Sequence, residues 1–185
     1  LNSTQKILLI KLKDNKKFIE NEKIGAKFYD FLKSDLKLKL TFFEPNIKDT
    51  AGTNKNFFDE FIHGLKLKSY IFDRYKSKKT IKKINLFIGG KNIPSKMDQI
   101  KFRSIEEGAF YTRDLVSEPG NILHPDEYAK RINSLKKLGL KINIYDKKKL
   151  KKLGMNTLLG VGQGSVRGSY LVTMEWKGIK KKSQP

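Results

Sequence analysis

Short apolar runs alternate with amphipathic helical stretches along the chain, and this order restricts the fold more than any other feature of the sequence. An apolar run that is bounded by lysines, or that alternates with them, predicts a strand. Five such runs lie at residues 6–12, 36–45, 84–90, 140–146 and 169–178. Because strands separated by helices usually pair in parallel, we expect an α/β protein whose N-terminal domain has α/β/α layers and a mostly parallel sheet.

The stretches between these runs carry apolar residues at helical spacing. Helices are predicted at residues 22–35, 53–77, 104–118, 125–139 and 147–154. Gly64 lies inside the second of these helices, where it indicates close packing. His124 and Pro125 suit a helix start, Gly139 a helix end, and Asp146 can cap the last helix.

Pro119 and Gly120 follow a long predicted helix and are the best candidates for a domain boundary. We expect an N-terminal α/β domain at residues 1–100, a linking helix at 101–120 and the opening of a second domain at 121–185. The chain starts with Leu1 rather than Met and ends in KGIKKKSQP, so we expect both ends to be cut.

The chain has 40 basic and 19 acidic side chains, which gives a formal net charge of +21. Only five of the basic residues are arginines, whereas proteins that read nucleic-acid sequence usually rely on arginine for bidentate contacts. Lysine runs lie at residues 78–79, 82–83, 147–149, 151–152 and 180–182. Each run is interpreted as solvated surface, although the total charge would attract polyanions at low salt.

The sequence contains no cysteine, so disulfides, thiolate metal ligands and cysteine nucleophiles are excluded. Its longest aliphatic run is ILLI, which is much shorter than the roughly 20 residues that span a bilayer. No signal peptide is visible. We therefore expect a cytoplasmic protein.

Gly160, Gly162 and Gly164 stand at every second position of LGMNTLLGVGQGS. A dinucleotide site requires G-x-G-x-x-G between a strand and a helix, but Ser165 and Arg167 occupy the third glycine position in the two available registers. A strand is predicted after this segment, so no helix N-terminus follows it. We interpret the segment as a structural turn.

Other residues with reactive side chains give no catalytic pattern. His63 is interpreted as a partly buried helix residue and His124 as a helix cap, because no second histidine lies one turn away from either. The acidic residues of one predicted helix are interpreted as a solvated face with ion pairs, since Arg103 lies four residues before Glu107. These residues are Glu106, Glu107, Asp114 and Glu118. No catalytic, cofactor-binding or metal-binding residue is predicted in this chain.

Four ordered stretches carry a family resemblance. KKLGMNTLLGVGQGS, residues 151–165, resembles the segment L-G-M-x-x-L-L-x-V-G-Q-G-S of the leucyl aminopeptidases, also called cytosol aminopeptidases or M17 peptidases. Residues 69–79, 111–131 and 170–178 resemble a helix end, the interdomain helix with the start of the second domain, and the strand after the glycine segment. Residues 1–68 match weakly.

The sequence departs from the usual family residues at three positions. His124 replaces a capping threonine, Ser117 a frequent asparagine and Trp176 a common tyrosine. These changes affect capping and packing. The resemblance also places the three glycines at a structural crossing near the domain junction.

The resemblance implies a two-domain, usually hexameric enzyme that removes N-terminal residues from peptides, with leucine preferred. Such enzymes use two divalent metals, namely zinc, manganese or magnesium, to polarise the carbonyl and activate water. The family's metal and catalytic motifs, V-G-K-G-V-T-F-D-T-G-G and N-T-D-A-E-G-R, are absent from this sequence.

The resemblance therefore places residues 121–185 at the opening of the metallopeptidase domain and implies that this chain binds no metal and is inactive by itself. The alternative is a basic DNA-binding or scaffold module, for which the +21 charge is the supporting feature.

Overall fold

The computed structural model describes residues 17–32, 39–43, 57–78, 85–89 and 93–178. The strand predicted at residues 6–12 lies outside these ranges. The chain divides into two compact units, residues 1–116 and 117–185, and the division lies close to Pro119.

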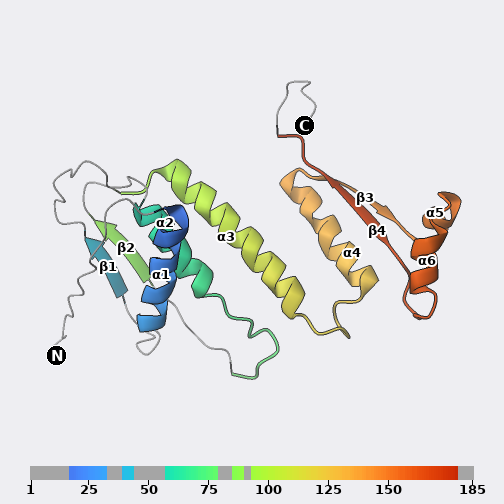
Figure 1. Cartoon of the computed structure of the whole chain (residues 1–185), viewed down its shortest axis with the longest axis horizontal. Coiled ribbons are helices and arrows are strands. Elements are labelled where there is room, and N and C mark those ends of the chain that lie inside the picture. Colours follow the sequence, from blue (N-terminus) through green and yellow to red (C-terminus); the bar gives the residue numbers. More distant parts are fainter. Residues whose placement is uncertain (1–16, 33–38, 44–56, 79–84, 90–92, 179–185) are drawn as a thin grey trace. The chain divides into compact units, whose positions relative to one another are not determined.

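The first unit contains three helices and two strands within the described residues (Figure 1). These are α1 (Phe18–Leu32), β1 (Lys39–Phe43), α2 (Phe57–Lys68), β2 (Asn85–Gly89) and α3 (Lys96–Ser117). Strands β1 and β2 pair in parallel, with Lys39 opposite Asn85 and Phe43 opposite Gly89. Both strands fall within runs that the sequence predicted as strands.

Helices α1 and α2 approach each other closely enough that two of their residues must be glycine. A Cβ atom on Gly64 would lie 1.9 Å from the carbonyl oxygen of Glu22, and one on Gly25 would lie 1.9 Å from that of Phe61. Since real Cβ atoms do not approach backbone atoms so closely, a larger residue would force the helices apart. The close packing predicted at Gly64 is confirmed.

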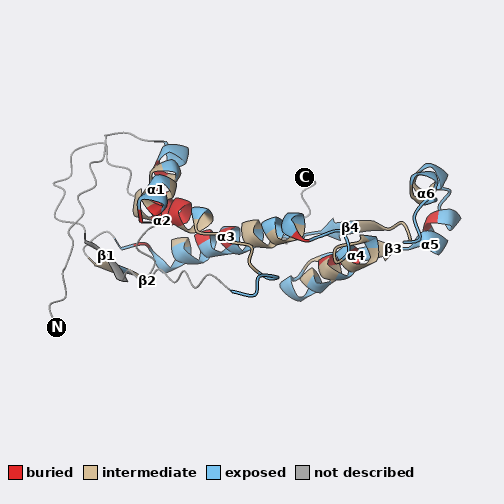
Figure 2. Ribbon diagram, turned by 90° about the horizontal axis from the view of Figure 1, so that it is seen from below, coloured by how far each residue is buried: buried red, intermediate tan, exposed pale blue. Residues whose placement is uncertain are grey.

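The core of this unit lies at the same crossing. Buried apolar side chains come mainly from α1 and α2, and Figure 2 shows the buried positions gathered there. The buried cluster consists of Tyr29, Phe61, Ile62 and Leu65. Leu86 and Ile88 of β2 pack against it, so the helix pair and the strand share one core.

Helix α2 ends at Lys68, nine residues before the predicted end of that helix. The following chain leaves the helix and packs along α3: the Tyr70 ring lies 5.5 Å from that of Phe110, and its hydroxyl donates a hydrogen bond of 2.8 Å to Asp114. Phe72, which we expected on the apolar face of the helix, therefore lies in the irregular segment that follows α2.

Helix α3 begins at Lys96, eight residues before its predicted start, and ends before Pro119 as predicted. Ser95 caps it, because its hydroxyl accepts a hydrogen bond of 3.1 Å from the backbone N–H of Asp98. The Ser95 hydroxyl also donates to the Asp98 carboxylate. This reciprocal arrangement fixes the helix start.

The second unit contains α4 (Pro125–Asn133), a short 3-10 helix (Ser134–Leu138), β3 (Lys141–Tyr145), α5 (Lys147–Lys152), α6 (Asn156–Gly162) and β4 (Leu171–Glu175). Gly139 ends the helical stretch with a φ of 92°, as its position predicted. The Asp146 side chain accepts a hydrogen bond of 2.9 Å from the Lys149 N–H and so caps α5, also as predicted.

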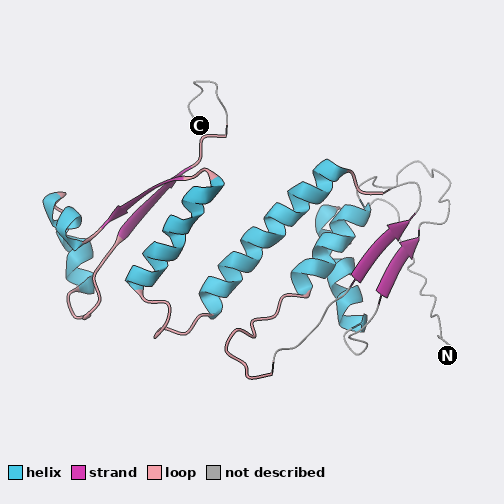
Figure 3. Ribbon diagram, turned by 180° about the vertical axis from the view of Figure 1, so that it is seen from behind, coloured by secondary structure: helices cyan, strands magenta, loops and turns pink. Residues whose placement is uncertain are grey.

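Strands β3 and β4 pair antiparallel, with Lys141 opposite Glu175 and Tyr145 opposite Leu171 (Figure 3). The expected α/β composition is therefore present, but the described strands form one parallel and one antiparallel pair instead of a layered, mostly parallel sheet. Between β3 and β4 the chain forms only two short helices and a turn, so β4 runs back along β3 in the opposite direction. Parallel pairing would require a crossover that brings the chain back to the end where β3 begins.

The glycine segment is only partly a turn. Gly160 and Gly162 lie in α6, and Gly164 lies in the turn that follows. A Cβ atom at Gly162 would lie 2.0 Å from the Ser169 hydroxyl, so this glycine leaves room for the chain entering β4. The predicted turn was wrong for the first two glycines because a short helix extends to Gly162.

Candidate functional site

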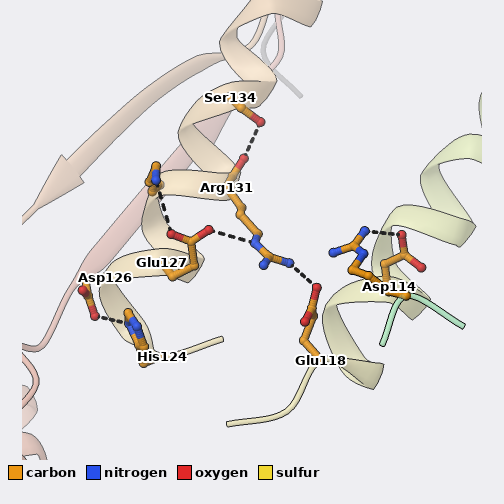
Figure 4. Close-up of polar contacts among 9 residues, drawn as sticks. Asp114, Glu118, His124, Asp126, Glu127, Arg131 and Ser134 are labelled. Atoms are coloured by element: carbon orange, nitrogen blue, oxygen red, sulfur yellow. Dashed lines mark hydrogen bonds and ion pairs between the residues drawn. The ribbon is translucent and has the colours of Figure 1, made fainter. Parts of the chain in front are cut away.

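Arg131 of α4 lies at the centre of an ion cluster near the start of the second unit. Its Nη1 donates a hydrogen bond of 2.8 Å to Glu118, and its Nε donates one of 3.1 Å to Glu127. Figure 4 shows the guanidinium between these two carboxylates. Because Glu127 lies one helical turn before Arg131 and Glu118 precedes α4, the cluster joins the incoming chain to the helix.

Burial makes the Arg131–Glu118 pair the stronger part of the cluster. The Glu118 side chain is fully buried and that of Arg131 is 21% exposed. The hydrogen bond that Arg131 donates to Glu118, followed by the one that it donates to Glu127, raises the pKa of Arg131. The Arg131 hydrogen bond in turn lowers the pKa of Glu127. The guanidinium of Arg131 stays charged, so it positions the chain that enters α4. It does not act as an acid or a base near neutral pH.

His124 occupies the N-cap position of α4, but its side chain does not bond to the helix backbone. Instead its Nδ1 pairs with the Asp126 carboxylate. Arg167 approaches the same carboxylate at 3.4 Å. Burial acts to raise the pKa of Asp126, but its backbone hydrogen bond, His124 and Arg167 lower it overall. His124 therefore holds the predicted N-cap position, but its side chain binds the nearby carboxylate and does not cap the helix.

A second polar cluster lies in the first unit, between α2 and α3. The Nδ1 atom of His63 lies 3.1 Å from one carboxylate oxygen of Glu106, and Lys66 Nζ lies 3.1 Å from the other. His63 and Glu106 are both buried. This cluster links the two helices through a buried charge.

The interpretation of the four acidic residues as a solvated face is correct only for Glu107, which pairs with Arg103 at 3.9 Å with both side chains exposed. Glu106 and Glu118 are buried because each meets a basic side chain. Asp114 accepts hydrogen bonds from Tyr70 and from Arg74, the latter at 3.2 Å. Each of the four carboxylates thus has its own basic or hydroxyl partner, and they do not form one acidic cluster.

The described residues do not fit a binuclear metal centre. Within those ranges, no three histidine or carboxylate side chains lie together as a possible metal-binding group. Each histidine of the chain bonds to a carboxylate, His63 in the first unit and His124 in the second. The donor set for two divalent cations is therefore not found in the described part of the chain.

The cluster around Arg131 and the cluster around Glu106 were not predicted from the sequence, because most of their residues are far apart in it. His63 and Glu106 are 43 positions apart, and Arg131 and Glu118 are 13 apart. The spacing of four between Glu127 and Arg131 is a signal that could have indicated one pair.

The C-terminal part of the chain matches a known family. Residues 110–185 match the sequence model of the cytosol aminopeptidase family, catalytic domain. A probable cytosol aminopeptidase of Sinorhizobium fredii is 41% identical over 135 residues, which are 68% of this chain and 27% of that protein. Residues 110–185 belong to the cytosol aminopeptidase family. The resemblance noted from the sequence motifs is confirmed, and the family is one of peptidases.

Solved structures agree with this assignment at the level of the fold. The chain aligns with a mutant of tomato leucine aminopeptidase with a TM-score of 0.70 and 18% identity, over 84% of this chain and 32% of that one. It aligns with the bottromycin maturation enzyme BotP in complex with Mn with a TM-score of 0.68 and 20% identity, over 85% and 33% of the two chains.

The chain spans about a quarter of the length of the curated cytosol aminopeptidases that it matches. None of the helices within the described ranges has the length and apolar character needed to cross a membrane.

Proposed function

We propose that this chain is part of a cytoplasmic, metal-dependent leucyl aminopeptidase that releases N-terminal residues from peptides and prefers leucine. The observation that carries the proposal is the family match over residues 110–185, which includes the glycine segment and β4. In the whole enzyme we expect a homohexamer and peptide substrates.

The two divalent metals of such an enzyme, manganese, zinc or magnesium, would polarise the scissile carbonyl and activate water. The described residues provide no donor set for them. Because V-G-K-G-V-T-F-D-T-G-G and N-T-D-A-E-G-R do not occur in the 185 residues, we expect the metal ligands to lie in a further part of the enzyme and this chain to be inactive by itself.

Within that enzyme we expect residues 1–100 to belong to the N-terminal domain and residues 121–185 to open the catalytic domain. The linking helix, expected at residues 101–120, corresponds to α3. Arg131 supports this role, because its ion pair with buried Glu118 holds the chain after the linking helix against α4. The contribution of this chain is thus to connect the domains and to position the first elements of the catalytic one.

The source DNA provides the test, read in frame beyond the codon for Pro185. We expect it to encode segments resembling V-G-K-G-V-T-F-D-T-G-G and N-T-D-A-E-G-R, with the lysine, aspartate and glutamate residues that bind the metals. A stop codon directly after Pro185 would contradict the proposal.

A further inference from the structure

A cavity of about 630 Å³ opens in the first unit, between α2, β2 and the N-terminal half of α3. Its lining includes Asp59, Ile62, Ile88 and Phe102, and exposed Ile93 and Ile100. The size is ordinary for a small-molecule site, and the lining combines apolar walls with a few ionisable groups.

Asp59 is the unusual member of this lining. It is only 8% exposed, yet its carboxylate has no hydrogen-bond or ion-pair partner within the described ranges. Buried carboxylates are normally paired, because an unpaired buried charge is strongly unfavourable. Lys101 is a nearby positive charge, but it forms no ion pair with Asp59. A buried acid that lines a cavity without a direct partner indicates that a ligand can supply one.

The basic side chains of the same lining do not supply that counter-charge. Lys66 pairs with Glu106 at 3.1 Å, and Arg103 pairs with exposed Glu107 at 3.9 Å. Lys96 is exposed at the rim. Two of the three basic groups in the lining thus already have carboxylate partners, and Asp59 is left to bind a cation from a ligand.

The electrostatic surroundings agree with this geometry. Burial, followed by the neighbouring charges of Asp98 and Glu60, raises the pKa of Asp59 to about 6, although Lys101 acts in the opposite direction. The carboxyl is thus poorly compensated in the free protein, and a bound cation would favour its ionised form.

We propose that this cavity binds a small organic ammonium compound with a branched aliphatic body, whose ammonium group donates hydrogen bonds to the Asp59 carboxylate. The aliphatic part lies against Ile62, Ile88 and Ile100. The site belongs to the first unit and uses none of the elements assigned to peptide hydrolysis, so its test is independent of the proposed function.

The test is a titration of the 185-residue chain with isoamylamine, followed by the amide chemical shifts in NMR spectra. Isocaproate is the matched probe, because it carries a carboxylate on nearly the same aliphatic skeleton. We expect isoamylamine, and not isocaproate, to shift the amides of residues that line the cavity.

Two variants and one control test the contacts that we propose between isoamylamine and the cavity. Asp59→Asn should weaken isoamylamine binding by about 30-fold, since loss of one partner of a buried charged hydrogen bond commonly costs that much. Ile100→Ser, at an exposed rim position, should weaken it about fivefold through lost apolar contact. Asp30→Asn makes the same chemical change at an exposed residue outside the cavity and should leave binding unchanged.

The proposal is overturned if isoamylamine does not bind the unmodified chain, if it binds the Asp59→Asn variant equally well, or if isocaproate binds as tightly. A cooperative thermal unfolding transition is the check that each variant is folded. We expect Asp59→Asn to remain folded because the substitution removes a buried, unpaired charge.

Discussion

At the residue scale, Arg131 joins the chain entering the second unit to α4 through a carboxylate that has no access to solvent. Replacing it with alanine would leave Glu118 buried without its partner. We expect Arg131→Ala to lower the free energy of unfolding of this unit by about 2–4 kcal/mol. Denaturant unfolding followed by the fluorescence of Trp176 measures this directly, because the single tryptophan of the chain lies in the same unit.

Arg103→Ala is the matched control, since Arg103 also forms an ion pair from a helix but does so on the surface. Exposed pairs of this kind contribute about 0.5 kcal/mol or less. Its effect on the first unit, measured by circular dichroism, should be correspondingly small. A loss for Arg131→Ala no larger than this would show that the buried pair does not hold the second unit together.

The raised pKa of Asp59 predicts that the stability of the first unit depends on pH. Its pKa is raised to about 6 in the folded chain, mainly by burial, so the fold favours the protonated form. The stabilisation that protonated Asp59 gives is fully present below about pH 4 and is lost as the pH rises through 6. We therefore expect Asp59→Asn to be more stable than the unmodified chain at pH 7 by about 2–3 kcal/mol.

The measurement is urea unfolding of the first unit at several pH values between about 4 and 7. The difference between the two proteins should shrink toward zero at the acidic end. Asp30→Asn makes the same substitution at an exposed residue and is the matched control. A constant difference across this range would mean that Asp59 does not titrate there.

At the element scale, the closest packing in the first unit is the crossing of α1 and α2 at Gly25 and Gly64. Because a Cβ atom at Gly64 would overlap the backbone of Glu22, Gly64→Ala must separate the helices. We expect a loss of about 3 kcal/mol or more in the free energy of unfolding, together with a lower melting temperature.

Gly108→Ala is the matched substitution in α3, where the new methyl group meets no atom within 4 Å. Here alanine should stabilise the helix by up to about 1 kcal/mol, because glycine is the poorer helix former. If Gly64→Ala were also neutral or stabilising, α1 and α2 would not approach each other closely at Gly64.

The sequence predicted most elements because their signals are local. The alternating run that became β3, the cap at Asp146 and the helix end at Gly139 each depend on a few neighbouring residues. Helix bounds were less predictable where tertiary contacts decide them. Tyr70 leaves the helical path to reach Phe110 and Asp114, and its position in the sequence gives no sign of either partner.

At the scale of the whole molecule, strand direction and the ionic clusters could not be predicted from local patterns. The return of β4 antiparallel to β3 depends on how α5, α6 and a glycine turn direct the chain, whereas the sequence predicted only the first of these helices and a turn after it. The pairing of His63 with Glu106 joins residues from two helices, and no spacing rule connects them. The family, in contrast, was predictable because its motif near Gly160 is continuous in the sequence.

We propose that this chain supplies the domain connection, but not the metal centre, of an aminopeptidase. The most direct test is the turnover of leucine p-nitroanilide, with manganese present, by the product of the complete reading frame and by the 185-residue chain. We expect hydrolysis by the complete product, lost when the metal is chelated, and none by the chain alone. Turnover by the chain alone would show that it contains a working active site, and no turnover by the complete product would show that it is not an aminopeptidase.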